Sequence, residues 1–127
     1  MSDVPARTRH HEVGKVGELP SGSRKLVEVE GASIGVFNVN GEFIAVLNVC
    51  PHALGPICRG RVGGTTLPSL PGEFRWGREG EILACPWHGW EFDLLTGKPL
   101  FGNLPNLRRY PVTVRDGAIF ITLKGMG

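Results

Sequence analysis

Two short segments of the chain hold the residues best suited to metal chemistry. Cys50 and His52 are separated by one proline, and Cys85 and His88 lie three positions apart with Pro86 after the cysteine. Because proline fixes φ and removes a backbone donor, it stiffens a loop that has to present two ligands. Two thiolates and two imidazoles can bind either a structural zinc ion or an iron–sulfur cluster.

The arrangement of these ligands favours an iron–sulfur cluster over a zinc site but does not exclude zinc. Zinc motifs usually pair cysteine with cysteine and histidine with histidine, at wider spacings. Here each segment supplies one thiol and one imidazole, so two facing loops can offer thiolates to one iron and imidazoles to the other. A zinc-stabilised interaction module stays open as an alternative from a different functional class.

The same two segments, C-P-H and C-P-W-H-G-W, resemble the Rieske [2Fe–2S] family, in particular its soluble, low-potential Rieske-type ferredoxins. The resemblance covers about residues 11–124 and continues beyond the ligands. Its further matching segments are Pro56-Ile57, Phe92-Asp93, Thr96-Gly97, Tyr110-Pro111-Val112 and Asp116-Gly117.

This resemblance implies one Rieske-type [2Fe–2S] cluster per chain. Cys50 and Cys85 would bind the inner iron, and His52 and His88 would bind the outer iron near the surface. The residues expected to surround the cluster are Pro51, Leu54, Gly55, Pro56, Pro86, Trp87, Gly89 and Trp90.

The implied function is one-electron transfer, as the ferredoxin component of an oxygenase system. Its expected partners are a flavin- or nicotinamide-linked reductase and a terminal oxygenase or other acceptor. An alternative is a fixed electron-transfer subunit resembling the small subunit of assimilatory nitrite reductase.

The resemblance also predicts a low reduction potential. High-potential members of the family carry an inter-loop disulfide where this chain has Gly55 and Trp87. They carry Ser and Tyr hydroxyls where it has Trp90 and Phe92. Hydrogen bonds to the cluster sulfurs raise the potential, so we expect a value near the bottom of the family range of roughly −150 to +300 mV.

The chain has too few histidines for a second catalytic centre. A mononuclear iron site needs two histidines and a carboxylate, and only His10 and His11, expected to be solvated, remain after the cluster. We therefore expect no substrate turnover by the chain itself. We expect Cys58 to be a small buried residue under the first loop, rather than a fifth ligand or a redox sensor.

Composition excludes several other functions. The net charge of the 127 residues is +2, too small to favour nucleic acid or an anionic membrane. No apolar run is long enough to span a bilayer, and residues 1–25 lack the apolar core of a secretory signal. Without such a signal, we expect the chain to stay in the cytoplasm. A reducing compartment disfavours disulfides and three cysteines cannot all pair within one chain, so metal binding is the expected use for two of them.

The residue pattern predicts an all-β fold, a small antiparallel β-sandwich or barrel. The family resemblance implies in addition a two-loop cluster-binding subdomain. Asn40-Gly41 is a hairpin signal that sets Phe37 opposite Ile44, and Asp116-Gly117 sets Val114 opposite Ile119. The predicted strands are residues 24–30, 32–39, 42–49, 73–76, 80–84, 90–94, 110–115 and 118–124.

We expect a flexible N-terminal tail over residues 1–10 and a single domain over residues 11–127. The stretch between the two ligand segments is unusually long, and its central part, residues 62–82, has two interpretations. It could be a partner-docking flap beside the cluster, or an extended hairpin loop without a partner.

Overall fold

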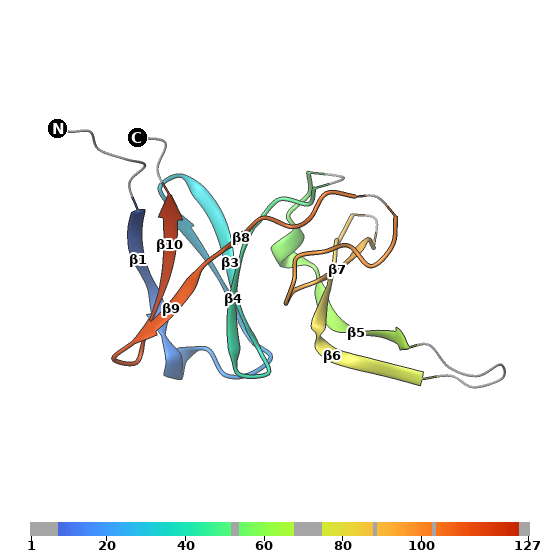
Figure 1. Ribbon diagram of the computed structural model, residues 1–127, viewed down its shortest axis with the longest axis horizontal. Helices are drawn as coiled ribbons and strands as arrows, with labels where there is room; N and C mark the ends of the chain where they lie inside the picture. The colour runs from blue at the N-terminus through green and yellow to red at the C-terminus, as the bar shows by residue number, and fades with distance from the viewer. Residues whose placement is uncertain (1–7, 52–53, 68–74, 88, 103, 125–127) are drawn as a thin grey trace.

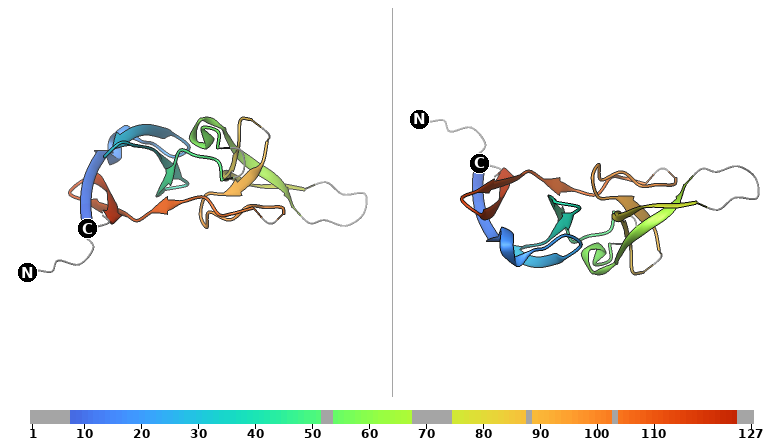
Figure 2. Two further views of the ribbon diagram at one scale, coloured as in Figure 1. Left: turned by 90° about the horizontal axis from the view of Figure 1, so that it is seen from above. Right: turned by 90° about the horizontal axis from the view of Figure 1, so that it is seen from below.

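The computed structural model describes residues 8–51, 54–67, 75–87, 89–102 and 104–124. These residues form antiparallel sheets joined by turns, and Figures 1 and 2 show two sheets packed at one end of the molecule and the third at the other. The described helices are two single 3-10 turns, η1 (Val16–Glu18) and η2 (Ile57–Arg59). Among the described residues, no helix has the length and apolar character needed to cross a membrane. The prediction of an antiparallel all-β fold is confirmed.

The first sheet has the order β1-β10-β9, with bounds Thr8–Lys15, Ala118–Lys124 and Val112–Arg115. Asp116 and Gly117 both have positive φ, as a tight hairpin between β9 and β10 requires. Val114 pairs with Ile119, so the predicted register is confirmed. The predicted strand 110–115 is wrong in one respect: Pro111 divides it, and the residues before the proline belong to the second sheet.

The second sheet has the order β2-β3-β4-β8, with bounds Arg24–Val29, Ala32–Val39, Glu42–Leu47 and Arg109–Tyr110. Asn40 and Gly41 both have positive φ, and Phe37 pairs with Ile44, as the Asn-Gly signal predicts. The strand β4 ends at Leu47, two residues earlier than expected. Tyr110 pairs with Ala45, so β8 is the edge strand beside β4, and β2 is the edge strand on the opposite side.

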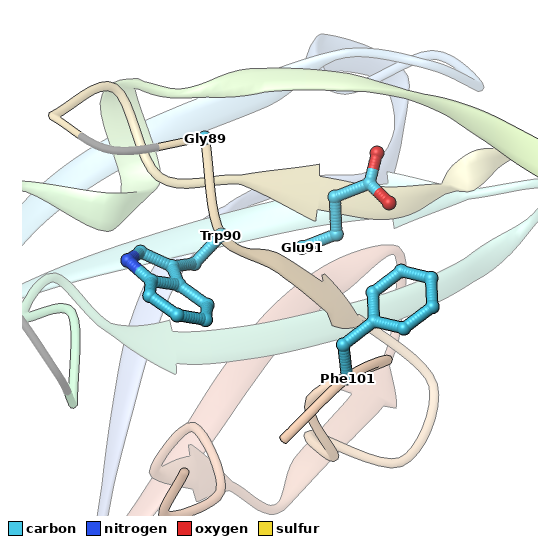
Figure 3. A pocket seen from close by; sticks show the side chains of 4 residues that line it. All are labelled: Gly89, Trp90, Glu91 and Phe101. Carbon is cyan, nitrogen blue, oxygen red and sulfur yellow. The ribbon is translucent and has the colours of Figure 1, made fainter.

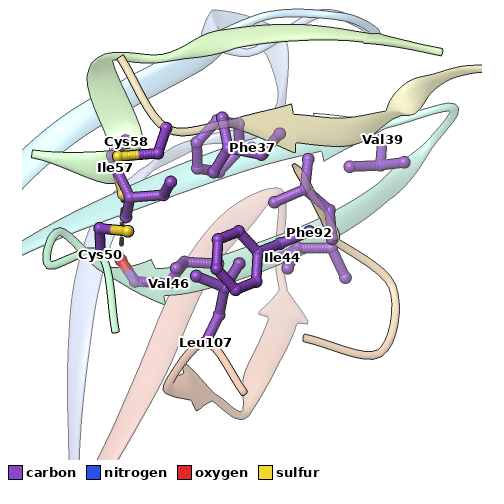
Figure 4. Packing of buried hydrophobic residues seen from close by; sticks show 12 residues of the cluster. Phe37, Val39, Ile44, Val46, Cys50, Ile57, Cys58, Phe92 and Leu107 are labelled. Atoms are coloured by element: carbon purple, nitrogen blue, oxygen red, sulfur yellow. Dashed lines mark hydrogen bonds between the residues drawn. The ribbon is translucent and has the colours of Figure 1, made fainter. Parts of the chain in front are cut away.

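Alternate residues of the second sheet serve two different cores. On one face Ile34, Val36 and Ala45 pack with Ile119 and Ile121 of the first sheet, which makes a β-sandwich. The other face packs on the cysteine-bearing part of the chain, and Figure 4 shows this second core. We call it the cysteine core; its buried members are Phe37, Val39, Ile44, Val46, Cys50, Ile57, Cys58, Leu83, Cys85, Phe92, Leu94 and Leu107.

The third sheet has the order β5-β6-β7, with bounds Arg61–Leu67, Arg75–Ala84 and Glu91–Asp93. Gly63 pairs with Ile82 but Thr65 pairs with Gly77, so residues 78–81 bulge opposite a single residue of β5. Beyond this bulge the hairpin projects from the rest of the fold (Figure 1). The long stretch 62–82 is therefore a β-hairpin in its described part, and its residues 68–74 lie outside the described residues.

The N-terminal boundary differs from the expected one. The strand β1 begins at Thr8, so residues 8–10 belong to the first sheet and not to a tail. His10 and His11 also have partners: His10 Nδ1 lies 3.0 Å from Thr122 Oγ1, and His11 Nε2 lies 2.6 Å from Glu30 Oε2. Hydrogen bonds from Arg9 and then His11 lower the pKa of Glu30 to about 2. This surface cluster holds β1 against the turn between β2 and β3.

Candidate metal centre

The first ligand segment forms a closed loop between β4 and η2. The N–H of Cys50 donates to the carbonyl of Gly55 at 2.7 Å, and the N–H of Leu54 donates to the carbonyl of Cys50 at 2.8 Å. Leu54 closes the loop with a φ of 59°, in the left-handed region. The backbone alone therefore returns the chain to its starting point within six residues.

The second ligand segment forms a loop with the same backbone hydrogen bonds. The N–H of Cys85 donates to the carbonyl of Trp90 at 2.8 Å, and the N–H of Gly89 donates to the carbonyl of Cys85 at 2.8 Å. Gly89 has a φ of 73°, and it occupies the position that Leu54 has in the first loop. The two loops therefore match in size and closure, although the spacing between cysteine and histidine differs.

Both cysteines of the loops are buried in the cysteine core. Cys50 is 0 % exposed and Cys85 is 2 % exposed. Neither they nor Cys58 form a disulfide. His52 and His88 lie outside the described residues, and among the described ones no three His, Cys, Asp or Glu side chains converge as metal ligands. The described part of the site is thus two buried thiols at the bases of two matched loops.

The loops contact each other at two levels. Where the first loop closes, Gly55 is packed so closely against Trp87 of the second loop that an added Cβ would lie 2.7 Å from the indole Cδ2. Near their bases, Gly60 lies against the carbonyl of Ala84, the residue before the second cysteine. Sequence reasoning named Gly55 and Trp87 as neighbours of the cluster but did not predict either contact.

The remaining predicted neighbours of the cluster lie on the same two loops. Leu54 and Trp87 are mainly exposed, at 73 % and 60 %. Pro86 and Gly89 are also exposed, Pro51 and Pro56 are half-buried, and Trp90 packs partly against the cysteine core. Each loop therefore runs from a buried cysteine to an exposed outer end.

A cavity of about 250 Å³ lies beside the second loop (Figure 3). It is lined by Gly89, Trp90, Glu91 and Phe101. Phe101 is 69 % exposed, and sequence reasoning did not single it out because no motif surrounds it. Like Leu54 and Trp87, it is a large apolar side chain that is mainly exposed near the loops.

Cys58 lies in the cysteine core and is 0 % exposed, as expected for a packing residue. Its Sγ donates to the carbonyl of Val46 at 3.4 Å. Burial raises the pKa of the Cys58 thiol to about 12, so the thiol stays protonated at neutral pH. A protonated thiol with a backbone partner is a poor nucleophile.

Arg24 stabilises the segment that follows the first loop. Its Nη1 donates to the carbonyl of Cys58 at 2.7 Å and also to the carbonyl of Gly60. The guanidinium carbon lies 5.6 Å from the centre of the Phe37 ring. Sequence reasoning did not find this arginine, because it is far from the loop in sequence and belongs to no motif.

This arrangement fits a [2Fe–2S] cluster of Rieske type. Such a cluster needs two thiolates on one iron, and Cys50 and Cys85 come from loops that contact each other within one core. The outer parts of the same loops are exposed, which fits a second iron nearer the surface. A buried pair of thiols at matched loop bases also satisfies the need to exclude water from the sulfur ligands.

Comparison with known proteins identifies a family and several similar proteins. The family model described as "Rieske [2Fe-2S] domain" matches residues 9–112. The "3-phenylpropionate/cinnamic acid dioxygenase ferredoxin subunit" of Photorhabdus laumondii is 35% identical over 85% of this chain and 89% of the relative. The "Naphthalene 1,2-dioxygenase system, ferredoxin component" of Pseudomonas aeruginosa is 32% identical, over 84% and 88%.

A solved structure agrees with the fold. The ferredoxin of Sphingomonas yanoikuyae B1 superimposes with a TM-score of 0.67 at 27% sequence identity. The superposition covers 89% of this chain and 97% of that ferredoxin. The similarity therefore extends over the sandwich and the cysteine-bearing part together.

Proposed function

The chain belongs to the Rieske [2Fe–2S] family, and we propose that it is the ferredoxin component of an oxygenase system. In this role it accepts one electron from a flavin- or nicotinamide-linked reductase and delivers it to a terminal oxygenase. The two matched loops with buried cysteines are the structural observation that carries the proposal. The named relatives, both ferredoxins of dioxygenase systems, support this choice of partner.

The cluster is proposed to be held by the two loops together. Cys50 and Cys85 bind the inner iron, and His52 and His88 bind the outer iron. When bound, the cluster supplies one site for a single electron, and with two thiolates and two neutral imidazoles its oxidised form carries no net charge. The cysteine core keeps water from the thiolate side.

The residues around the loops support a potential low in the Rieske range. Phe92 is fully buried and has no hydroxyl to donate to a cluster sulfur. The Gly55 and Trp87 positions make a packing contact and no disulfide. Since hydrogen bonds to the cluster sulfurs raise the potential, the lack of a hydroxyl group at Trp90 and Phe92 favours a low value.

The chain itself is proposed to catalyse no substrate turnover. His10 and His11, the only histidines outside the ligand set, are engaged with Thr122 and Glu30 in the first sheet and its neighbouring turn. We propose the cytoplasm as its compartment, since the cysteines are not used for disulfides. We also propose a single domain, with β1 included at its N-terminal side in place of a boundary at residue 11.

Two alternatives remain distinguishable by simple measurements. The family match favours the iron–sulfur cluster over the zinc-stabilised module that the ligand set alone left open. A fixed subunit resembling the nitrite reductase small subunit would co-purify with a large catalytic subunit, whereas a ferredoxin component would purify alone.

The deciding experiment is EPR of the anaerobically purified, dithionite-reduced protein, with iron and sulfide quantified alongside. We expect a rhombic signal of low average g and about two iron and two sulfide per chain. The ligand variants H88A and C85S should lose the cluster, while H10A, which changes a histidine outside the ligand set, should keep it. A colourless protein with stoichiometric zinc, or an H88A variant with a normal visible spectrum, would contradict the proposal.

A further inference from the structure

One contact between the two loops is made by an aromatic side chain, Trp87. Gly55 is buried, and a Cβ built on it would lie 2.7 Å from Cδ2 and 3.0 Å from both Cε2 and Cγ of Trp87. These three atoms belong to the centre of the indole and not to its far edge. The ring therefore occupies the space that any side chain at residue 55 would need.

The backbone of Gly55 transmits this contact to the first cysteine. Its carbonyl accepts the N–H of Cys50 at 2.7 Å and the N–H of Ile57 at 2.9 Å. A displacement of Gly55 would therefore shift both the start of the first loop and the start of η2. Trp87 lies two residues after Cys85, so the contact joins the backbones that carry the two buried thiols.

The exposure of Trp87 indicates that it is not an ordinary core residue. It is 60 % exposed, whereas Trp90 of the same loop packs partly against the cysteine core. An indole with most of its surface in water adds little to core burial. Its indole packs closely on Gly55 of the opposite loop.

We infer that Trp87 is a positioning residue, which fixes the two ligand loops relative to each other by packing on Gly55. The inference rests on the proposed function, because it concerns a cluster held by both loops. Each loop supplies one thiol and one imidazole in that proposal. A change in the separation of the loops therefore alters the ligand geometry of both irons together.

The test compares the holoprotein with the variants W87A and W87F. The readouts are the EPR line widths of the reduced cluster, the reduction potential and the rate at which EDTA removes iron from the oxidised protein. We expect W87A to release iron about tenfold faster, in line with other residues that orient metal ligands, and to broaden the EPR lines. W87F should restore wild-type values in large part, because a phenyl ring can still cover Gly55.

Changing the glycine tests the same contact from the other side. In G55A the new methyl group needs the space of the indole, so iron release should accelerate as in W87A. In the double variant G55A/W87A the effects should not add, because either change alone already removes the contact. F101A is the matched control: it removes another exposed aromatic ring beside the second loop and should leave all readouts unchanged.

The possible results separate the inference from the proposed function. Wild-type line widths and release rates in W87A, or additive effects in the double variant, would overturn the positioning role while the cluster assignment stands. A wild-type protein without iron and sulfide would instead contradict the proposed function.

Discussion

The α-carbon of Gly60 lies directly against the carbonyl oxygen of Ala84. A Cβ built on Gly60 would lie 1.7 Å from that oxygen and 3.1 Å from the carbonyl oxygen of Ile57. The φ of Gly60 is −76° and its ψ is 175°, a conformation open to every residue. The requirement for glycine here is therefore one of space alone, and it lets the bases of the two ligand loops meet.

The variant G60A should be strongly destabilised for this reason. Its methyl group can be accommodated only if the backbone before Cys85 moves, so we expect the free energy of unfolding to fall by about 3 kcal/mol, the upper end of the usual cost of overpacking. Thermal and urea unfolding of the holoprotein would measure this. G17A is the control, because nothing lies within 4 Å of its added Cβ; equal stability of the two variants would contradict the prediction.

The variant C58A should keep the cluster. The Cys58 thiol is fully buried and donates to the carbonyl of Val46, so its removal costs packing and one weak hydrogen bond. We expect the free energy of unfolding to fall by about 1–2 kcal/mol. The visible spectrum and the iron content per chain are the measurements, and a loss of iron would reveal Cys58 as a ligand.

Cys58 should also make the protein less stable in alkali. Its pKa rises from an ordinary 9.0 to about 12 on folding. Above about pH 9 the unfolded chain releases a proton that the native chain keeps, so stability falls as pH rises towards 12. The wild-type protein should therefore lose more stability than C58A between pH 8 and pH 10. Parallel curves of melting temperature against pH would show that the thiol titrates normally in the folded state.

The hairpins could be predicted because their signals are local. Asn40-Gly41 and Asp116-Gly117 adopt positive φ at both turn positions, and a two-residue turn fixes the register of its strands. The pairing of Phe37 with Ile44 follows from that rule, and so does its burial on one face.

Other parts of the fold carried no comparable signal. The strand β1 has a single buried side chain, Val13, so no alternation of apolar residues marks it. The strand β5 contains Gly63 and Gly64 and pairs across a bulge, which breaks the period of two.

In the site, as in the fold, the local features could be predicted and the long-range contacts could not. The tight spacing of each cysteine and histidine is local, and the structure brings the two cysteine loops together. The assignment of ligands to the two irons stays a prediction. The contacts of Trp87 with Gly55 and of Arg24 with Gly60 join residues more than 30 positions apart, and no sequence pattern predicts them.

Leu54 has an unfavourable conformation and an unfavourable environment at once. Its φ of 59° is strained for a leucine, and its side chain is 73 % exposed. The second loop has Gly89 at the matched position, which shows that the loop closes without a side chain there. Strain of this kind in a loop beside the proposed cluster points to a function for the side chain. We expect Leu54 to contact the terminal oxygenase.

The variant L54G should weaken binding to the oxygenase without lowering the stability of the protein. Glycine relieves about 1–2 kcal/mol of left-handed strain, and its greater freedom in the unfolded chain offsets about 0.5–1 kcal/mol, so the melting temperature should stay equal or rise slightly. The KM for the ferredoxin in a reconstituted reductase–oxygenase assay should nevertheless increase several-fold, because an exposed apolar contact is lost. L54N, whose side chain tolerates positive φ, should behave alike. V114T, an exposed apolar position on β9 in the first sheet, should leave KM unchanged. An unaltered KM in both Leu54 variants would mean that the partner does not bind this loop.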